Sequence, residues 1–309
     1  MRFCAFTHAG AARLGLVDDG EVFALPEGVT LRGLLEAGDD SLQSAGQSAR
    51  WAGELVLPID GLVLRSPLPD PPTVRDFYAF ERHVATARRS RGLEMDPLWY
   101  EQPVFYFSNP YAICGPGDLV AAPAGSVELD FELEVAAIIG RRGRDLVPSE
   151  AGAYLAGFCI MNDWSARDIQ RREMPLQMGP VKGKDFATSL GPFFVTADEL
   201  ADVHSREGFD LTMTARVNGR EYSRANLAEL YWSFEEMVAY ASRSTEVRPG
   251  DVLGSGTCGT GCILELSAVH GPDAYPWLQP GDLVELEVDR LGLLANTVAE
   301  PGTPPTPSD

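Results

Sequence analysis

The sequence predicts an α+β protein that is rich in β-strands. Apolar or β-branched runs separated by turn residues recur along most of the chain, and only a few segments show a helical pattern. Strands and helices do not alternate regularly, as they would in a doubly wound parallel sheet. We therefore expect a mixed, strand-rich architecture with few helices.

The length of the chain and its prolines predict two domains. The 309 residues suffice for one large domain and one small one. SPLPDPPT is typical of a rigid connector, and PGTPPTPSD at the end is typical of a disordered tail. The predicted division is a small N-terminal domain at 1–65, the connector at 66–73, a large domain at 74–298 and the tail at 299–309.

The N-terminal domain is predicted to consist mainly of strands. RFCAF, RLGLV and EVFAL are typical of short strands separated by Gly-containing turns. One helix is expected in this domain, at 30–37.

Turn residues divide the large domain into further strands. Three Pro-Gly-Asp turns each precede an apolar or β-branched run, and they lie at 116–118, 249–251 and 280–282. Asn218-Gly219, between TMTARV and REYS, predicts a β-hairpin. The helices expected in this domain lie at 78–91, 165–173 and 233–243.

The charge balance excludes two classes of partner. The chain has 45 acidic and 25 basic residues, which gives a net charge of −20. Nucleic acids and anionic membrane surfaces repel such a protein. We expect neither as a partner.

The cysteines favour a reducing compartment. The chain has five, an odd number, and they are scattered. No stretch approaches the roughly 20 apolar residues of a membrane span, and the start, MRFCAFTHAG, lacks the apolar run of a signal peptide. We therefore expect a cytoplasmic protein with free thiols. Cys258 and Cys262 lie close together, but zinc needs two more ligands and none is near in sequence, so buried thiols are expected.

One alternating stretch, VELDFELEV at 127–135, poses the main question about function. In a single β-strand its acidic residues would share one face, about 7 Å apart, and would repel one another. These residues are Glu128, Asp130, Glu132 and Glu134. Such a face is either solvated or in contact with positive charge, and the pattern alone leaves both alternatives open.

Two more acidic residues come at places where the chain is held rigidly. Asp76 follows the connector, in RDFYAFERH, and the apolar run LAGFCIM leads to Asp163 in IMNDWSARDIQ. Together with carboxylates from 127–135 they would form an all-oxygen cage. Hard cations such as Mg²⁺, Ca²⁺ and Mn²⁺ take such ligands.

Several motifs resemble the fumarylacetoacetate hydrolase family, over roughly residues 70–290. They are RDFY with a His five residues after the Tyr, the E-x-E pair on an apolar strand, MNDWSARDIQ, a Gly-Lys pair with a Thr four residues after the Lys, and SGT followed by an L-E-L strand. The resemblance implies a mixed β-roll in a catalytic large domain, a smaller N-terminal β domain and a homodimer.

The resemblance also implies a metal centre. The implied ligands are Asp76, Glu132, Glu134 and Asp163, with Glu128 and Asp130 outside the ligand set. The cofactor would be a divalent cation, Mg²⁺ first, with Mn²⁺ and Ca²⁺ as alternatives. The residues implied to lie close to the metal are Lys184 and Thr188.

The same resemblance assigns the groups around the substrate. His83 is the implied general base, and Glu265 is the carboxylate that orients it. The groups around the developing oxyanion are Arg167, Gln170 and Lys184. The substrate contacts are Tyr78, Tyr106 and Thr257.

Two departures from the family pattern concern substrate recognition. Met174 stands where the founding enzyme has a second substrate-contacting tyrosine. The arginine expected in a lid after His83 has three candidates within 84–102, namely Arg88, Arg89 and Arg91. The resemblance therefore predicts the reaction chemistry of this chain more directly than it predicts the substrate.

The implied reaction is metal-dependent hydrolysis of a C–C bond in a β-diketone or acylpyruvate-type keto acid. Water would be activated by His83, and each well-placed oxyanion donor is worth about 3–4 kcal/mol. The alternative is a decarboxylase, or an isomerase or tautomerase of a related keto acid, because the same enolate serves all of these reactions. A non-catalytic protein, in which the cation only stabilises the structure, would not need His83, Lys184 and Gln170.

Overall fold

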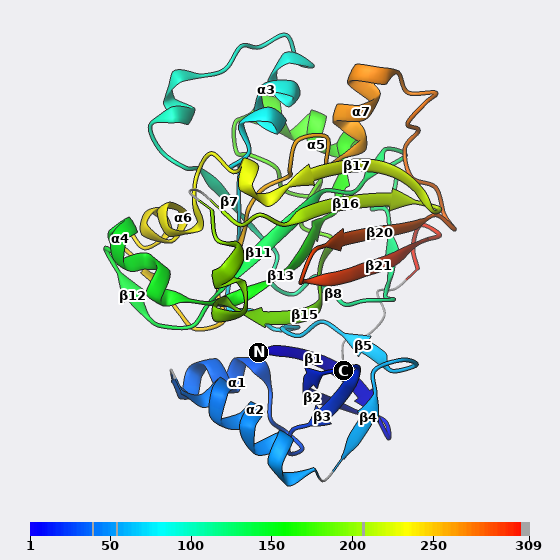
Figure 1. The fold of residues 1–309 in the computed structure, drawn as a ribbon. Coiled ribbons are helices and arrows are strands. Elements are labelled where there is room, and N and C mark those ends of the chain that lie inside the picture. Colours follow the sequence, from blue (N-terminus) through cyan, green and yellow to red (C-terminus); the bar gives the residue numbers. More distant parts are fainter. Residues whose placement is uncertain (39, 54, 206–207, 304–309) are drawn as a thin grey trace.

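The computed structural model describes residues 1–38, 40–53, 55–205 and 208–303. It confirms the predicted fold class, because strands outweigh helices and form large mixed sheets (Figure 1). The part of the predicted tail at 304–309 lies outside the described residues. None of the helices in the described ranges is both long and apolar enough to span a membrane.

The helices confirm four predictions and add one long element. They are α1 (Leu31–Ala37), α2 (Ser41–Ala52), α3 (Glu81–Arg89), α4 (Pro148–Ala151), α5 (Arg167–Glu173), α6 (Phe234–Ala241) and α7 (Ile263–His270). Sequence analysis missed α2, since its buried residues are the small Gly46 and Ala49 and leave only a weak apolar period. An added Cβ at Gly46 would lie 2.8 Å from the Met1 sulfur.

A long sheet runs through the molecule in the order β4-β3-β2-β1-β15-β13-β11-β19-β6-β7, with β5 beside β1 and β8 beside β15. Its N-terminal strands are β1 (Arg2–His8), β2 (Ala11–Asp18), β3 (Glu21–Ala24), β4 (Val56–Pro58) and β5 (Val63–Arg65). Its other strands are β6 (Val74–Phe77), β7 (Phe105–Ser108), β8 (Ile113–Cys114), β11 (Leu133–Ile139), β13 (Leu155–Asp163), β15 (Thr188–Thr196) and β19 (Val252–Gly254).

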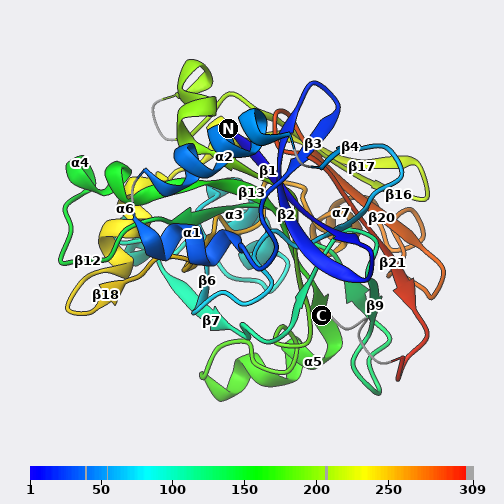
Figure 2. The same cartoon turned by 90° about the horizontal axis from the view of Figure 1, so that it is seen from below.

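The first strand joins the N-terminal residues to the rest of the chain. β1 pairs antiparallel with β15, with Phe3 opposite Phe194, and these two rings pack in one buried cluster. Figure 2 shows α1 and α2 beside the strands of this part, at the end from which it views the molecule. The functional residues predicted above all lie beyond β5.

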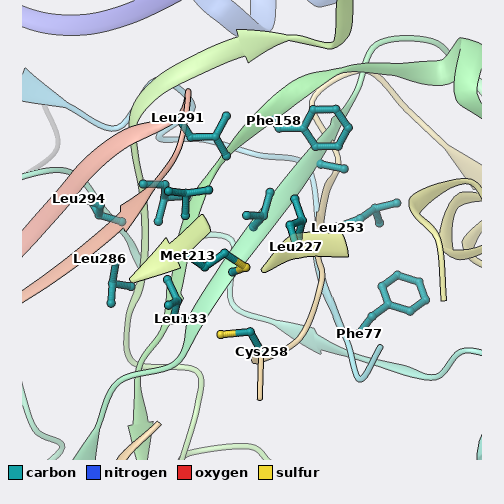
Figure 3. Close-up of a cluster of buried hydrophobic side chains, with 14 of the residues drawn as sticks. Phe77, Leu133, Phe158, Met213, Leu227, Leu253, Cys258, Leu286, Leu291 and Leu294 are labelled. Atoms are coloured by element: carbon teal, nitrogen blue, oxygen red, sulfur yellow. The ribbon is translucent and has the colours of Figure 1, made fainter. Parts of the chain in front are cut away.

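A second sheet packs over the centre of the first and encloses the main core. Its strands are β9 (Leu119–Ala121), β16 (Thr212–Val217), β17 (Arg220–Asn226), β20 (Leu283–Val288) and β21 (Gly292–Ala299), in the order β17-β16-β20-β21-β9. The Asn218-Gly219 hairpin prediction is confirmed by the pairing of β16 with β17. Leu133, Phe158, Met213 and Leu286 fill the space between the sheets (Figure 3).

The central strand β11 is buried on both faces. Its residues alternate between two clusters, with Val135 and Ala137 in the main core and Ala136 and Ile138 in the cluster shared with the N-terminal part. A carboxylate on such a strand has no solvated face available to it. The acidic residues of this region therefore need partners other than water.

The prediction of one unbroken strand at 127–135 is wrong. Two short ladders flank a break, because β10 (Leu129–Asp130) pairs with β14 (Ser165–Ala166) while β11 starts only at Leu133. At the break the Glu132 N–H donates to the Asn162 side chain, 2.9 Å away. A third short ladder joins β12 (Gly143–Arg144) and β18 (Glu246–Val247).

A buried ion pair fixes the strands that lead into the acidic region. Arg75 on β6 donates to Asp251, at 3.3 Å, just before the parallel neighbour β19. Asp251 also accepts from the Thr73 hydroxyl and from the Arg248 N–H, at 2.8 and 2.9 Å. Both members of the ion pair are buried, and the Arg75 guanidinium lies over the Phe107 ring.

We predict that Asp251→Asn lowers the free energy of unfolding by about 3–5 kcal/mol, because it leaves a buried guanidinium without this anion. Urea denaturation measures the loss. The matched control is Glu221→Gln, which breaks an exposed pair with Arg224 and should leave the free energy almost unchanged. Equal effects of the two substitutions would contradict the structural role of the buried pair.

Candidate active site

The four predicted metal ligands come together in the interior. Asp76, Glu132, Glu134 and Asp163 are all buried, and one ligand oxygen from each lies within 4.8 Å of the others. They come from β6, the β10–β11 break, β11 and the end of β13. The pairing of neighbouring strands in the long sheet thus brings together carboxylates from four places in the sequence.

Two glycines that sequence analysis did not single out make room for this cluster. A Cβ on Gly254 would lie 2.5 Å from Asp76 Oδ1 and 3.0 Å from Glu134 Oε2. Gly256 has φ +76° and donates its N–H to both of these carboxylates, at 3.2 and 3.1 Å. The Gly-rich loop 254–261 carried this signal, because close backbone approach to a ligand site requires glycine.

Lys184 and Thr188 lie against the cluster, as predicted. The Lys184 ammonium donates to both Glu132 and Asp163. Burial by itself would lower the pKa of Lys184, but the carboxylates of Asp163 and Glu132 raise it, so the ammonium stays charged. Thr188 is fully buried at the start of β15, opposite Asp163.

The cluster fits a divalent cation by its charges and by its unused oxygens. Burial, together with the neighbouring carboxylates, raises the pKa of Asp76 and of Glu134 well above the usual range. Among the described residues, Asp163 Oδ1 and Thr188 Oγ1 are buried and have no hydrogen-bond partner. A hard cation would offset the negative charge and use such oxygens.

The predicted base and its orienting carboxylate also meet. His83 Nδ1 on α3 lies 2.5 Å from Glu265 Oε1 on α7, and both side chains are buried. The other Glu265 oxygen accepts the Thr260 N–H at 3.2 Å. Figure 1 shows α3 and α7 at the same end of the molecule, opposite the N-terminal strands.

The prediction that L-E-L forms a strand is wrong, because these residues lie in α7. Asp130 supplies the reason. Its carboxylate accepts the first two helical N–H groups, from Ile263 and Leu264, at 2.7 and 3.0 Å. A buried anion at this end satisfies donors that an isolated helix leaves unpaired.

Asp130 also binds Arg167, and sequence analysis missed this bridging position. The Arg167 Nε donates to Asp130 at 2.8 Å, and Nη2 donates to Glu132 at 2.7 Å. The remaining Nη1 donates to the Gln170 side-chain oxygen at 3.0 Å. One guanidinium therefore links the carboxylate cluster to the residue that caps α7.

The network next to Glu132 keeps that carboxylate ionised. Burial by itself would raise the pKa of Glu132, but the positive charges of Lys184 and Arg167, with a smaller effect of His83, hold it below the usual value. The predicted oxyanion groups thus lie beside the cluster. Two of them, Arg167 and Lys184, are held by its carboxylates.

The predicted substrate contacts lie around the same centre. Tyr106 on β7 donates its hydroxyl to Asp163, and Thr257 donates to Glu134 at 3.3 Å. The Tyr78 ring stands edge-on to the His83 ring, with centroids 5.5 Å apart. Burial raises the pKa of Tyr78 to about 12, so its hydroxyl is a donor at neutral pH.

Two of the three candidate arginines after His83 bind backbone carbonyls nearby. Arg88 donates to the Glu94 carbonyl at 2.6 Å, and Arg91 donates to the Ala87 carbonyl at 2.9 Å. The charge of Arg91 acts on Tyr78, where it opposes the effect of burial on the pKa. Of the three candidates, Arg91 is therefore the one whose charge affects the Tyr78 hydroxyl. Met174, the other departure, lies at the end of α5 and is exposed.

Comparison with known proteins gives one family. The model described as fumarylacetoacetate (FAA) hydrolase, C-terminal, matches residues 73–299. A mitochondrial oxaloacetate tautomerase of Homo sapiens is 34% identical over 201 residues, which cover 64% of this chain and 59% of the human protein. The Xenopus laevis mitochondrial oxaloacetate tautomerase is 30% identical over 273 residues, which cover 87% of this chain and 78% of that protein.

A solved structure extends the similarity to the whole fold. A fumarylacetoacetate hydrolase from Exiguobacterium antarcticum is 27% identical, with a TM-score of 0.76, and the match covers 97% of this chain and 99% of that one. The sequence relatives carry mitochondrial names, so the cytoplasmic location stays a prediction.

We predict that Mg²⁺ raises the Tm more at about pH 8 than at about pH 5.5. The unfolded carboxyls ionise near pH 4, whereas those of Asp76 and Glu134 have raised pKa values in the fold. Their contribution to the stability of the metal-free protein is therefore full below about pH 4 and is lost as pH rises. Bound cation would replace the protons, stabilising the fold by about 2.7 kcal/mol at 100 times its Kd.

Thermal unfolding of chelated protein, with and without Mg²⁺ at both pH values, measures this difference. Asp76→Asn should remove most of the Mg²⁺-dependent rise. A rise in Tm that is equal at both pH values, or that survives this substitution, would contradict cation binding by the cluster.

Proposed function

The chain belongs to the fumarylacetoacetate hydrolase family, and on that premise we propose that it is a divalent-cation-dependent tautomerase of 2-oxo dicarboxylic acids such as oxaloacetate. One observation carries the proposal: the buried His83–Glu265 pair is connected to the four-carboxylate cluster, because Arg167 binds both Glu132 and Asp130, and Asp130 holds the start of the helix that carries Glu265. The names of the two tautomerase relatives support the substrate class.

The cation would be held by Asp76, Glu132, Glu134 and Asp163. Mg²⁺ is the first candidate, and Mn²⁺ and Ca²⁺ also accept oxygen ligands. When bound, such a cation polarises the carbonyl of a 2-oxo acid and makes the adjacent C–H more acidic.

His83 is the group that moves the proton. Its Nδ1 faces a carboxylate of Glu265, so Nδ1 carries the hydrogen and the other ring nitrogen, Nε2, is left as the base. Nε2 takes a proton from the carbon next to the carbonyl, and the imidazolium gives a proton to the oxygen; the enol O–H then exchanges with solvent. Glu265 stabilises the transient imidazolium, which makes it an orienting and electrostatic partner of the base.

Hydrolysis of a C–C bond in an acylpyruvate-type acid is the second candidate. The same pair can activate water, and the solved structure with the TM-score of 0.76 is a hydrolase by name. Hydrolysis, however, needs free donors for a tetrahedral oxyanion. Arg167 and Lys184, two of the three predicted oxyanion groups, instead bind carboxylates of the cluster. Decarboxylation would also form an enolate at the cation, but by breaking the bond to a carboxylate and releasing carbon dioxide.

The charge at Arg91 suits a second carboxylate on the substrate. Arginine binds carboxylates through two parallel hydrogen bonds. Arg91 lies in the segment after α3, which also carries the base, and its charge acts on Tyr78. We assign the substrate's distal carboxylate to Arg91. The homodimer, and the exclusion of nucleic acid and membranes, stay predictions.

The proposed activity predicts faster exchange of the C3 hydrogens of oxaloacetate for deuterium, in heavy water, with the carbon skeleton intact. NMR of chelated protein and of protein reloaded with Mg²⁺ measures this exchange. His83→Ala should lower the Mg²⁺-dependent rate about 10²–10⁴-fold. His204→Ala, at a half-exposed histidine outside the cluster, is the control.

The products distinguish the candidates. Two acids formed from an acylpyruvate, without exchange on oxaloacetate, would establish hydrolysis instead. Release of carbon dioxide would establish decarboxylation. Retention by His83→Ala of a rate within a factor of two of the parent would exclude His83 as the base.

We predict that Arg91→Gln raises the KM for a 2-oxo dicarboxylate tenfold or more, roughly the value of a hydrogen-bonded charge, and leaves the KM for a monocarboxylic 2-oxo acid nearly unchanged. Arg89→Gln, two residues away and exposed, is the matched control. Steady-state kinetics on the two substrates measure the difference. Equal changes of both KM values in Arg91→Gln and Arg89→Gln would contradict the assignment of the distal carboxylate to Arg91.

A further inference from the structure

We propose that His83, Cys262 and Glu265 form a second metal site, for Zn²⁺, which is separate from the four-carboxylate cluster and switches off the base when occupied. The three ligand atoms lie within 4.8 Å of one another, and all three residues are buried. Sequence analysis found no partners for Cys258 and Cys262, because His83 comes from a distant helix and Glu265 was expected on a strand.

Local structure explains why the three side chains converge. Cys262 is the N-cap of α7 and Glu265 is the third helical residue, a spacing that brings two side chains together at the start of a helix. The Cys262 sulfur lies 3.9 Å from Glu265 Oε1. His83 comes from α3, which packs against α7, and its Nδ1 lies 2.5 Å from the same oxygen.

The donor set differs in chemistry from the carboxylate cluster. One nitrogen, one sulfur and one oxygen suit Zn²⁺, whereas Mg²⁺ prefers oxygen alone. Three protein ligands and one position open to water or another small ligand are typical of zinc sites that are not purely structural.

The distances need only a small adjustment for zinc. At usual bond lengths a tetrahedral ion separates S and O ligands by about 3.6 Å and N and O ligands by about 3.4 Å. The sulfur is already 3.9 Å from Oε1, and the His83–Glu265 contact has to open by about 1 Å.

The charge and proton balance explains how zinc would inhibit. An ordinary cysteine thiol keeps its proton at neutral pH, and zinc binds the thiolate form. Zn²⁺ displaces the thiol proton to solvent, and the charges of thiolate and carboxylate together neutralise the ion. With zinc on Nδ1, the ring proton moves to Nε2, which then has no lone pair to act as a base.

The binding of zinc does not depend on the proposed function, whereas the inhibition does. Two measurements therefore separate the claims. Co²⁺ serves as the spectroscopic probe of the site, because a thiolate ligand gives a charge-transfer absorption that oxygen ligands do not give. Excess Mg²⁺ keeps the carboxylate cluster occupied during the titration.

We expect one equivalent of Co²⁺ to produce the thiolate band in the parent protein. Cys262→Ser should abolish the band, and Cys258→Ser, at a buried cysteine in the same loop, should keep it. His83→Gln retains the thiol and should weaken Co²⁺ binding at least tenfold. Absence of the band in the parent protein, or its persistence in Cys262→Ser, would overturn the site. The Mg²⁺-dependent Tm rise verifies that each variant is folded.

Turnover tests the second claim. With Mg²⁺ present, Zn²⁺ should inhibit C3 exchange in the parent protein, and the half-inhibiting concentration should rise at least tenfold in Cys262→Ser but not in Cys258→Ser, each relative to its own uninhibited rate. Equal inhibition of all three proteins would place zinc in the carboxylate cluster and overturn the switch. A thiolate band without inhibition would keep the site and overturn the switch, whereas the His83→Ala rate tests His83 as the base.

Discussion

The molecule depends on one electrostatic constraint: four carboxylates are held together away from water. Asp76, Glu132, Glu134 and Asp163 would repel one another and lose their hydration, and either effect alone disfavours ionisation. Two buried cations, Lys184 and Arg167, offset part of this charge, but burial and the neighbouring carboxylates still raise the pKa values of Asp76 and Glu134. The uncompensated remainder is the reason that we propose a cation at this cluster.

The fold holds these carboxylates in place with rigid backbone. Strand ends from the centre of the long sheet carry the carboxylates, and their buried neighbours leave little room for rearrangement. The break between β10 and β11 turns Asp130 and Glu132 toward different partners. Gly254 and Gly256 allow the chain to pass against the cluster where any side chain would collide.

A second level of organisation connects the cluster to the base. Arg167 contacts both Glu132 and Asp130, Asp130 holds the first turn of α7, and α7 carries Glu265. His83 is then fixed against Glu265 from the facing helix α3. His83 and the carboxylate cluster are therefore connected through shared partners, and the same packing places the Cys262 sulfur close to His83 and Glu265.

The sequence by itself determined the fold class, most of the helices and the membership of the acidic cluster, because turn residues, apolar patterns and the family motifs are local properties of the chain. It could not reveal α2, whose buried face is small, or the helical state of 263–270, which depends on the distant carboxylate of Asp130. It left open whether the acidic stretch was solvated. Only the tertiary structure decided that Asp130, Glu132 and Glu134 are buried, and that Cys262 lies beside His83 and Glu265. Distances between segments far apart in sequence are set by how the sheets and helices pack, and no local pattern encodes them.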